Sequence, residues 1–344
     1  MKDVNTKIIN AVIEKAKQKC PESLALVGIY GSVRTKDEYE KSDLDLLILI
    51  NDDNGWQLSD CFILEDEQIG YDIYCTSWQM LEEDAECHHA HISKLMDSEI
   101  VYTANKAVTE RLNQLKEKAN DILKTEKRFQ RINEIQNHIY KVYADAMTAD
   151  TIGKQREYSA YLISLSLDIV MLWNGEYFKR GIKRTFDELE GKQLPYGFKE
   201  NIENIVRAQE MSEISRLLTS FLQSIINFTK QTKNKIQPTK EALSGTYEEM
   251  FSNWKNKMSD AADRGDTFSS FMNMASLQVM FSEISGKTEL PEFNIMDKFD
   301  PDKLSDNTKV FDDALEEYRY EYEKLGIELR CFKNIDEFIK VYLG

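Results

Sequence analysis

The stretch GIYGSVRTKDEYEKSDLDLLILI, residues 28–50, decides the fold of the N-terminal part of this chain. One apolar run ends on the pair Gly31-Ser32, ten mostly charged residues follow, and Asp43 and Asp45 open the next apolar run. A strand by itself requires neither a tight Gly-Ser turn nor an acidic start. The stretch therefore raises the question of which ligand these polar ends serve.

Around this stretch the hydrophobic pattern predicts an α+β fold. An amphipathic helix is expected over 4–19, and short runs rich in leucine, β-branched and aromatic residues predict strands at 24–30, 44–50, 69–75 and 99–104. Helical periodicity then dominates, over 108–148, 155–174, 199–211, 213–232, 238–262, 267–284 and 307–325. We therefore expect a mixed sheet flanked by helices, followed by an all-helical C-terminal part.

The same pattern suggests three domains. Residues 1–107 form the sheet-containing domain, 108–232 a helical domain and 233–344 a helical extension of unknown role. A linker is expected between about 104 and 128, where charge is dense, unless a helix runs through it. The run EEYRYEYEKLGIELRCF, residues 316–332, predicts a helix, a turn and an edge strand.

Composition limits the partners and the compartment. The 344 residues carry a net charge of −16, which disfavours a nucleic-acid partner and attracts cationic small molecules. Five cysteines without a spacing pattern indicate reduced thiols in a cytoplasm. No signal-peptide pattern is visible, and no apolar run reaches the ~20 residues of a membrane span.

The polar ends of the predicted strands form a site for a metal-bound nucleotide. A Gly-Ser turn after a strand offers backbone N–H groups and a hydroxyl to an anion such as a triphosphate. Asp43 and Asp45 are one residue apart, so on a strand they face the same side and can share a cation. Asp72, inside the strand-like run GYDIY, adds a third carboxylate. Hard oxygen ligands beside phosphates predict Mg²⁺, and two ions about 4 Å apart suit an in-line phosphoryl displacement.

This arrangement resembles the nucleotidyltransferase fold of the DNA polymerase β superfamily. Gly31-Ser32, a ten-residue gap, Asp43-Leu44-Asp45 and a later in-strand Asp72 are similar to the kanamycin nucleotidyltransferase type, which modifies aminoglycosides. The segments WNGEYFKRGIKRTFDELEGKQLPYGFKENI and ISRLLTSFLQSIINF resemble the helical second domain of those enzymes. The resemblance covers roughly residues 20–232 and implies dimers in which sites are built across the interface.

The resemblance implies a role for each matching residue. Gly31 and Ser32 would hold the β- and γ-phosphates, and Asp43, Asp45 and Asp72 would hold the metals. A substrate hydroxyl would attack the α-phosphorus of ATP or another nucleoside triphosphate and release pyrophosphate.

A general base and a triphosphate lysine are expected from the helical domain. Asp150 and Lys154 lie at i, i+4, Glu157 follows one turn later, and Asp145 is an equal candidate for the base. Arg34, in the charged loop, is a further candidate for phosphate binding.

Two other motifs have simpler interpretations. The run Lys179-Arg180 with Lys183-Arg184 is more typical of a solvated helix end than of a phosphate site. The run ECHHAHIS, residues 86–93, invites a metal interpretation, but the chain has no second Cys or His cluster to complete a zinc site. Polar surface or cleft lining is the better interpretation.

The leading hypothesis is a cytoplasmic Mg²⁺-dependent enzyme that transfers AMP to a hydroxyl of a small molecule, with an aminoglycoside-like polycation as the acceptor. One alternative is a transferase that modifies a protein or extends an RNA. The other is a non-catalytic, antitoxin-like nucleotide-binding module.

Overall fold

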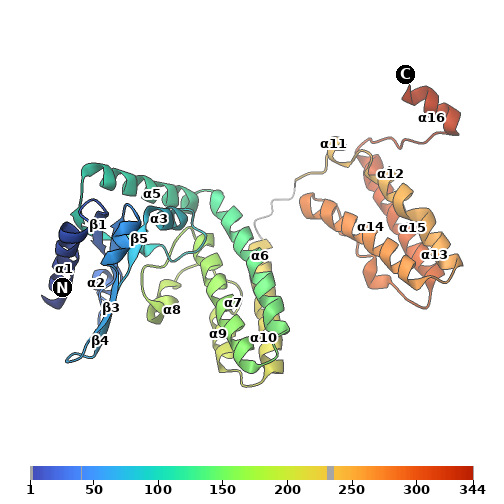
Figure 1. Ribbon diagram of the computed structural model, residues 1–344. Helices are drawn as coiled ribbons and strands as arrows, with labels where there is room; N and C mark the ends of the chain where they lie inside the picture. Colours follow the sequence, from blue (N-terminus) through green and yellow to red (C-terminus); the bar gives the residue numbers. More distant parts are fainter. Residues whose placement is uncertain (1–2, 40, 231–235, 344) are drawn as a thin grey trace. The chain divides into compact units, whose positions relative to one another are not determined.

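The computed structural model describes residues 3–39, 41–230 and 236–343. The chain divides into two compact units, Met1–Thr229 and Lys230–Gly344, which are described separately (Figure 1).

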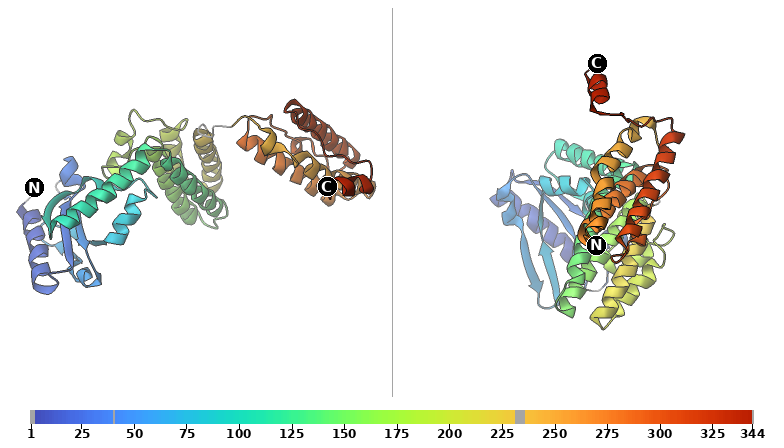
Figure 2. Two further views of the ribbon diagram at one scale, coloured as in Figure 1. Left: turned by 90° about the horizontal axis from the view of Figure 1, so that it is seen from above. Right: turned by 90° about the vertical axis from the view of Figure 1, so that its right-hand side faces the viewer.

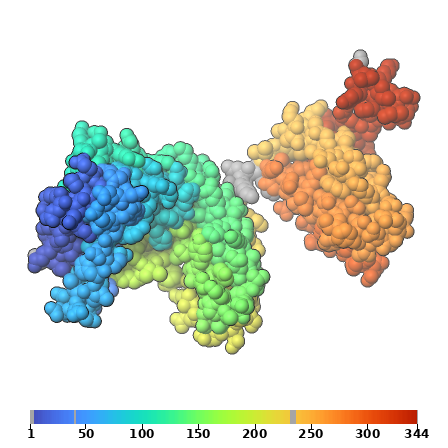
Figure 3. Space-filling model, in the orientation of Figure 1, coloured from blue at the N-terminus to red at the C-terminus, as the bar shows by residue number. Residues whose placement is uncertain are grey.

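A mixed four-stranded sheet forms the centre of the first unit, in the order β5-β2-β1-β6. Its strands are β1 (Leu24–Ile29), β2 (Leu46–Ile50), β5 (Cys75–Ser77) and β6 (Glu99–Thr103). β1 is antiparallel to β2 and β6, whereas β2 and β5 are parallel. A separate hairpin joins β3 (Asp60–Leu64) to β4 (Ile69–Ile73) and stands out from the surface in Figure 3.

Alternating side chains of β2 supply two different cores. Leu46, Ile48 and Ile50 pack with helix α1 (Asp3–Lys19), whereas Leu47 and Leu49 belong to the core on the other face. This alternation follows from the two-residue period of a strand. The left view of Figure 2 shows α1 and α5 (Lys106–Lys124) on opposite sides of the strands.

Helices continue the second core away from the sheet. They are α3 (Trp78–Ala85), α4 (Ser93–Asp97), α5, α6 (Lys127–Met147), α7 (Ile152–Trp173), α8 (Thr185–Glu188), α9 (Phe198–Arg207) and α10 (Met211–Lys230). α6 and α7 form an antiparallel pair, and α7 also packs against α9. Buried side chains from the sheet to α10 form one continuous apolar cluster, so this sheet face and the helices share a core.

The structure confirms the α+β class and changes several expected bounds. The stretch expected to contain a linker is helix α5, with Leu112, Leu115 and Ala119 in the core. A break at Thr125 divides the helix expected over 108–148. β2 begins at Leu46, so Asp43 and Asp45 precede the strand instead of lying in it. β3 was not predicted, because its side chains are mostly exposed and lack a clear alternating pattern.

The second unit is helical in its described part. It contains α11 (Lys240–Leu243), α12 (Thr246–Met250), a π-helical turn (Phe251–Lys255), α13 (Asn256–Asp263), α14 (Thr267–Lys287), α15 (Leu304–Lys324) and α16 (Ile335–Tyr342). α13, α14 and α15 pack around an aromatic core that includes Phe281, Phe311 and Tyr318. The edge strand expected after α15 is wrong, because residues 327–332 form no strand.

Within the described residues, none of the helices combines the length and the apolar character that crossing a membrane requires.

Candidate active site

Gly31 lies directly against Asp45, the residue that precedes β2. Its φ of +67° is a left-handed conformation that glycine adopts without strain. A Cβ at this position would lie 1.9 Å from Oδ2 of Asp45. The backbone N–H of Tyr30 also donates to the carbonyl oxygen of Asp45, at 3.1 Å. The Gly-Ser turn and the carboxylate of Asp45 are therefore built against each other, and only glycine fits between them.

The environment of Asp45 disfavours its charged form. Burial raises its pKa, the negative charge of Asp43 raises it further, and the backbone N–H of Ser32 partly offsets both by donating to the carboxylate. Tyr30 responds to the same acidic region: burial and then the charges of Asp45, Asp84, Asp43 and Asp72 raise its pKa to about 12. A cation placed beside Asp43 and Asp45 would relieve this repulsion.

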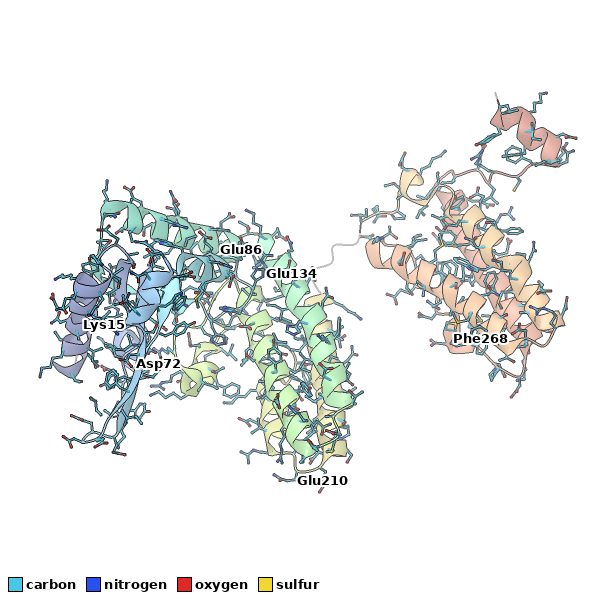
Figure 4. The ribbon with its side chains drawn as sticks, viewed as in Figure 1. Lys15, Asp72, Glu86, Glu134, Glu210 and Phe268 are labelled. Atoms are coloured by element: carbon cyan, nitrogen blue, oxygen red, sulfur yellow. The ribbon has the colours of Figure 1, made fainter. Side chains whose placement is uncertain are left out.

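Asp72 reaches the same region from the hairpin. Figure 4 marks it on β4, which continues through Tyr74 into β5. β5 pairs with β2 in parallel, with Cys75 opposite Ile48. The charge of Asp72 contributes to the raised pKa of Tyr30, so this carboxylate lies near the same acidic region. The Asp72 side chain is held by the thiol of Cys61, which donates to Oδ1 at 3.1 Å.

A cationic segment from the helical part of the unit faces the turn. Residues 179–184, called here the basic segment, follow α7, and Phe178 anchors them by donating its N–H to the carbonyl oxygen of Ala90 at 2.8 Å. The carboxylate of Glu188 accepts the backbone N–H groups of Lys179 and Arg180, each at 2.9 Å. These bonds fix the backbone of the segment independently of its side chains.

A cleft of about 340 Å³ separates the turn from the basic segment. Asp43 and Asp45 lie beside the turn, whereas the cations belong to the basic segment, which also pairs with Asp37. Its lining residues are Tyr30, Gly31, Ser32, Asp37, Tyr39, Ser42, Asp43, Asp45, Ser93, Lys179, Arg180, Gly181, Ile182 and Lys183. The cleft can thus receive a ligand that is anionic at one end and needs a cation at the other.

Residues 9–168 match the family model described as nucleotidyltransferase domain. The matched residues all lie in the first unit, and the match supports a nucleotidyltransferase activity for it.

No curated protein matches the chain. Among solved structures, the nucleotidyltransferase-like protein from Exiguobacterium sibiricum 255-15 is 11% identical, with a TM-score of 0.38 over 82% of this chain and 92% of that chain. So low a score carries no argument about fold or function.

Four residues predicted from the sequence line the cleft of the first unit: Gly31, Ser32, Asp43 and Asp45. Arg34 does not line it. Its guanidinium, which was expected to bind phosphate, instead pairs with the carboxylate of Glu99 on β6.

The candidates on the helices lie far from the cleft. Asp145 is near the end of α6, Asp150 is in the following turn, and Lys154 pairs with Glu157 at 2.8 Å in the first turns of α7. The basic segment follows the other end of this 22-residue helix, so about 30 Å separates the two along the axis. The neighbouring Arg156 donates to the carbonyl oxygen of Ala208. Two residues after Ala208 comes Glu210, which Figure 4 marks at the far tip of the helices. The structure does not bring these residues together with Asp43 and Asp45.

The sequence favoured a solvated helix end over a phosphate site for three cations of the cleft, and it gave no role to Asp37. Lys179, Arg180 and Lys183 were interpreted as a solvated helix end, yet they line the cleft. Their only sequence signal is the clustered KRGIKR run, which does not reveal what it faces. Asp37 lies among many charged loop residues, and nothing in its neighbours marks it as buried.

The residues of the histidine run pack within the first unit and lie near two of its carboxylates. Cys87 is buried, and burial raises the pKa of its thiol to about 12. Nε2 of His89 lies 3.6 Å from Asp84, and Nε2 of His91 lies 3.9 Å from the buried Asp168. His91 also stacks on Phe178, with ring centroids 4.9 Å apart. The run therefore joins the sheet side of the unit to α7 and to the base of the basic segment.

Across the described ranges, no three His, Cys, Asp or Glu side chains converge closely enough to hold a metal by themselves. Two carboxylates remain available at the cleft, Asp43 and Asp45. Mg²⁺ commonly takes only one or two protein carboxylates and completes its shell with substrate phosphates and water. The donor set is therefore compatible with a metal that arrives with a nucleotide.

Proposed function

We propose that the chain transfers a nucleoside monophosphate, AMP first among them, from a Mg²⁺-bound nucleoside triphosphate to a hydroxyl of a small molecule. One observation carries the proposal: the Gly31-Ser32 turn, the Asp43 and Asp45 carboxylates and the basic segment line a single cleft. A triphosphate needs backbone donors and cations, whereas its metal needs carboxylates; the cleft offers the donors and carboxylates around the turn and the cations in the basic segment.

The residues of the cleft divide the work between binding and orientation. The N–H and hydroxyl groups of the turn bind phosphate oxygens, and Lys179 and Lys183 neutralise the triphosphate from the other wall. Asp43 and Asp45 would hold Mg²⁺, with Asp72 nearby on β4, and the bound metal would polarise the phosphates and stabilise charge on the leaving group. The acceptor oxygen forms a bond to the α-phosphorus, the bond from that phosphorus to pyrophosphate breaks, and the hydroxyl proton is released.

An aminoglycoside-like polycation is the acceptor that we propose. The net charge of −16 concentrates cations near the protein, and the kanamycin-type spacing of the sequence motif points the same way. Exposed Tyr39 and Ile182 at the cleft add apolar surface on which a sugar or a base can pack.

The test is pyrophosphate release from each of the four nucleoside triphosphates with Mg²⁺, with and without a panel of aminoglycosides and other hydroxylated molecules. Acceptor-dependent release that disappears in Asp43→Asn would support the proposal and identify both substrates. If none of the small molecules in the panel stimulates pyrophosphate release, but a protein or an RNA does, the small-molecule assignment would be rejected.

A further inference from the structure

The carboxylate of Asp37 is held by two arginines of the basic segment. Nε of Arg184 lies 3.1 Å from Oδ1, and Nε of Arg180 lies 3.4 Å from Oδ2. Lys183 adds a bond from its Nζ to the carbonyl oxygen of Asp37, at 2.7 Å. The Asp37 side chain is only 7% exposed. A buried carboxylate thus neutralises the cations that face the Gly-Ser turn.

Asp37 is also close to the turn in the chain and in space. Its N–H donates to the carbonyl oxygen of Ser32 at 3.1 Å, and both residues line the cleft. Arginine binds carboxylate and phosphate oxygens with the same donor geometry. The Asp37 carboxylate therefore occupies a position beside the Thr35 hydroxyl and between two guanidinium groups, which are donors that a terminal phosphate can also use.

We propose that Asp37 is an internal substitute for a phosphate: without nucleotide it holds Arg180 and Arg184, and the terminal phosphate of the triphosphate displaces it. The inference rests on the proposed function, because it concerns the regulation of the same site. Nucleotide binding then requires that Asp37 give up its ion pairs with the basic segment to the terminal phosphate.

The rest of the structure permits this exchange. The backbone of the basic segment is fixed by Glu188 and by the anchor at Phe178, so the segment keeps its place when Asp37 leaves. Burial raises the pKa of Asp37, but the Thr35 hydroxyl and the two arginines outweigh it and hold the pKa below its ordinary value. At neutral pH the carboxylate is therefore ionised and competes with phosphate as an anion.

A supporting role of Asp37 in phosphate binding predicts the opposite effect on nucleotide affinity. If Asp37 only orients the arginines for phosphate, its removal would weaken nucleotide binding. If Asp37 competes with phosphate, its removal tightens binding, because two guanidinium groups are left without their anion.

The experiment measures binding of Mg²⁺-ATP and of inorganic triphosphate to the full chain by titration calorimetry, with no acceptor present. We expect the Kd of both probes to fall about tenfold in Asp37→Asn, the size of one lost charge-assisted contact. Asp187→Asn is the matched control. Asp187 pairs with the same Arg184 at 2.7 Å but does not line the cleft, so its removal should change Kd less than about twofold.

Each outcome decides a different statement. Binding to the wild type that weakens or stays unchanged in Asp37→Asn would overturn the inference and leave the proposed function standing. If the Kd falls equally in Asp187→Asn, the tighter binding would be explained by the change in net charge alone, and the inference would also be overturned. If neither Mg²⁺-ATP nor triphosphate binds to the wild type or to any variant, both the inference and the proposed function would be overturned. Asp37→Ala serves as a second variant, and thermal unfolding of each protein shows whether it is folded.

Discussion

Two hollows of this molecule are lined by carboxylates, one in each unit, and they differ in what faces the acids. The cleft of the first unit measures about 340 Å³, and the hollow of the second about 630 Å³. The larger hollow is lined by Pro291, Phe293, Asp313, Glu316, Glu317, Tyr320 and Glu321. Its carboxylates all come from α15, at the three- to four-residue spacing of an exposed helix face.

The difference teaches that neither size nor acidity defines a site. The lining residues of the larger hollow include no lysine or arginine, and two of its acids, Glu316 and Glu321, pair with cations of their own helix. In the smaller cleft, acids, backbone donors and cations come from segments that are distant in the sequence. The burial of Asp45 against Gly31 keeps that acid partly out of water, where charge interactions are stronger.

The largest effect that would sharpen this comparison is the loss of a cleft carboxylate. Asp43→Asn or Asp45→Asn should lower nucleotide turnover at least about a thousandfold, because the metal-bound triphosphate loses a ligand. The matched change in the other hollow, Glu316→Gln, should leave turnover unchanged. Pyrophosphate release measures both, and near-normal turnover in Asp45→Asn would contradict the metal assignment.

The second prediction concerns the contact between the turn and Asp45. Gly31→Ala should lower turnover about a hundredfold, since its Cβ displaces the Asp45 carboxylate. Gly191→Ala is the control: φ there is +74°, so the backbone strain is similar, but no atom lies within 4 Å of the added Cβ. Each variant should lose about 1–2 kcal/mol of unfolding free energy from strain. Equal turnover in the two variants would show that the contact with Asp45 is not needed.

A smaller effect is expected from the basic segment. Lys179→Met should raise the KM for the nucleoside triphosphate about tenfold and change kcat less, because it removes charge from the binding wall. Lys106→Met, on the exposed start of α5, removes the same charge away from the cleft and should leave KM unchanged. Steady-state kinetics at two salt concentrations measures both variants, and a KM unchanged in Lys179→Met would remove the segment from the site.

The smallest effect on turnover is expected at Asp168, behind the cleft. Burial raises its pKa to about 7, although the N–H of Ala90 donates to it at 2.8 Å. The folded state therefore holds a proton that the unfolded state releases near pH 4, so stability falls as pH rises from about 4 to about 7. Asp168→Asn, which can still accept from Ala90, should be more stable than the wild type at pH 8 by a few kcal/mol. Denaturant unfolding across this range checks the sign, and a wild type that gains stability over it would contradict the prediction.

The sequence alone determined the local part of the site. Four features depend only on neighbouring residues: the strands 24–29 and 46–50, the turn at Gly31-Ser32, and the acids before β2. Strand periodicity and the conformational freedom of glycine act over a few residues, so these features can be predicted without knowing the rest of the fold.

Tertiary structure decided which wall faces that turn. Lys183 and Asp37 are 146 residues apart, and whether they meet depends on the length of α7, the break at Thr125 and the path of the chain after Trp173. The same packing places Asp150 and Lys154 at the far end of α7. The path of the chain from β4 into β5 likewise brings Asp72 to the acidic region around Tyr30. These placements follow from burial of one continuous core across sheet and helices, a property of the whole unit that no short stretch of sequence contains.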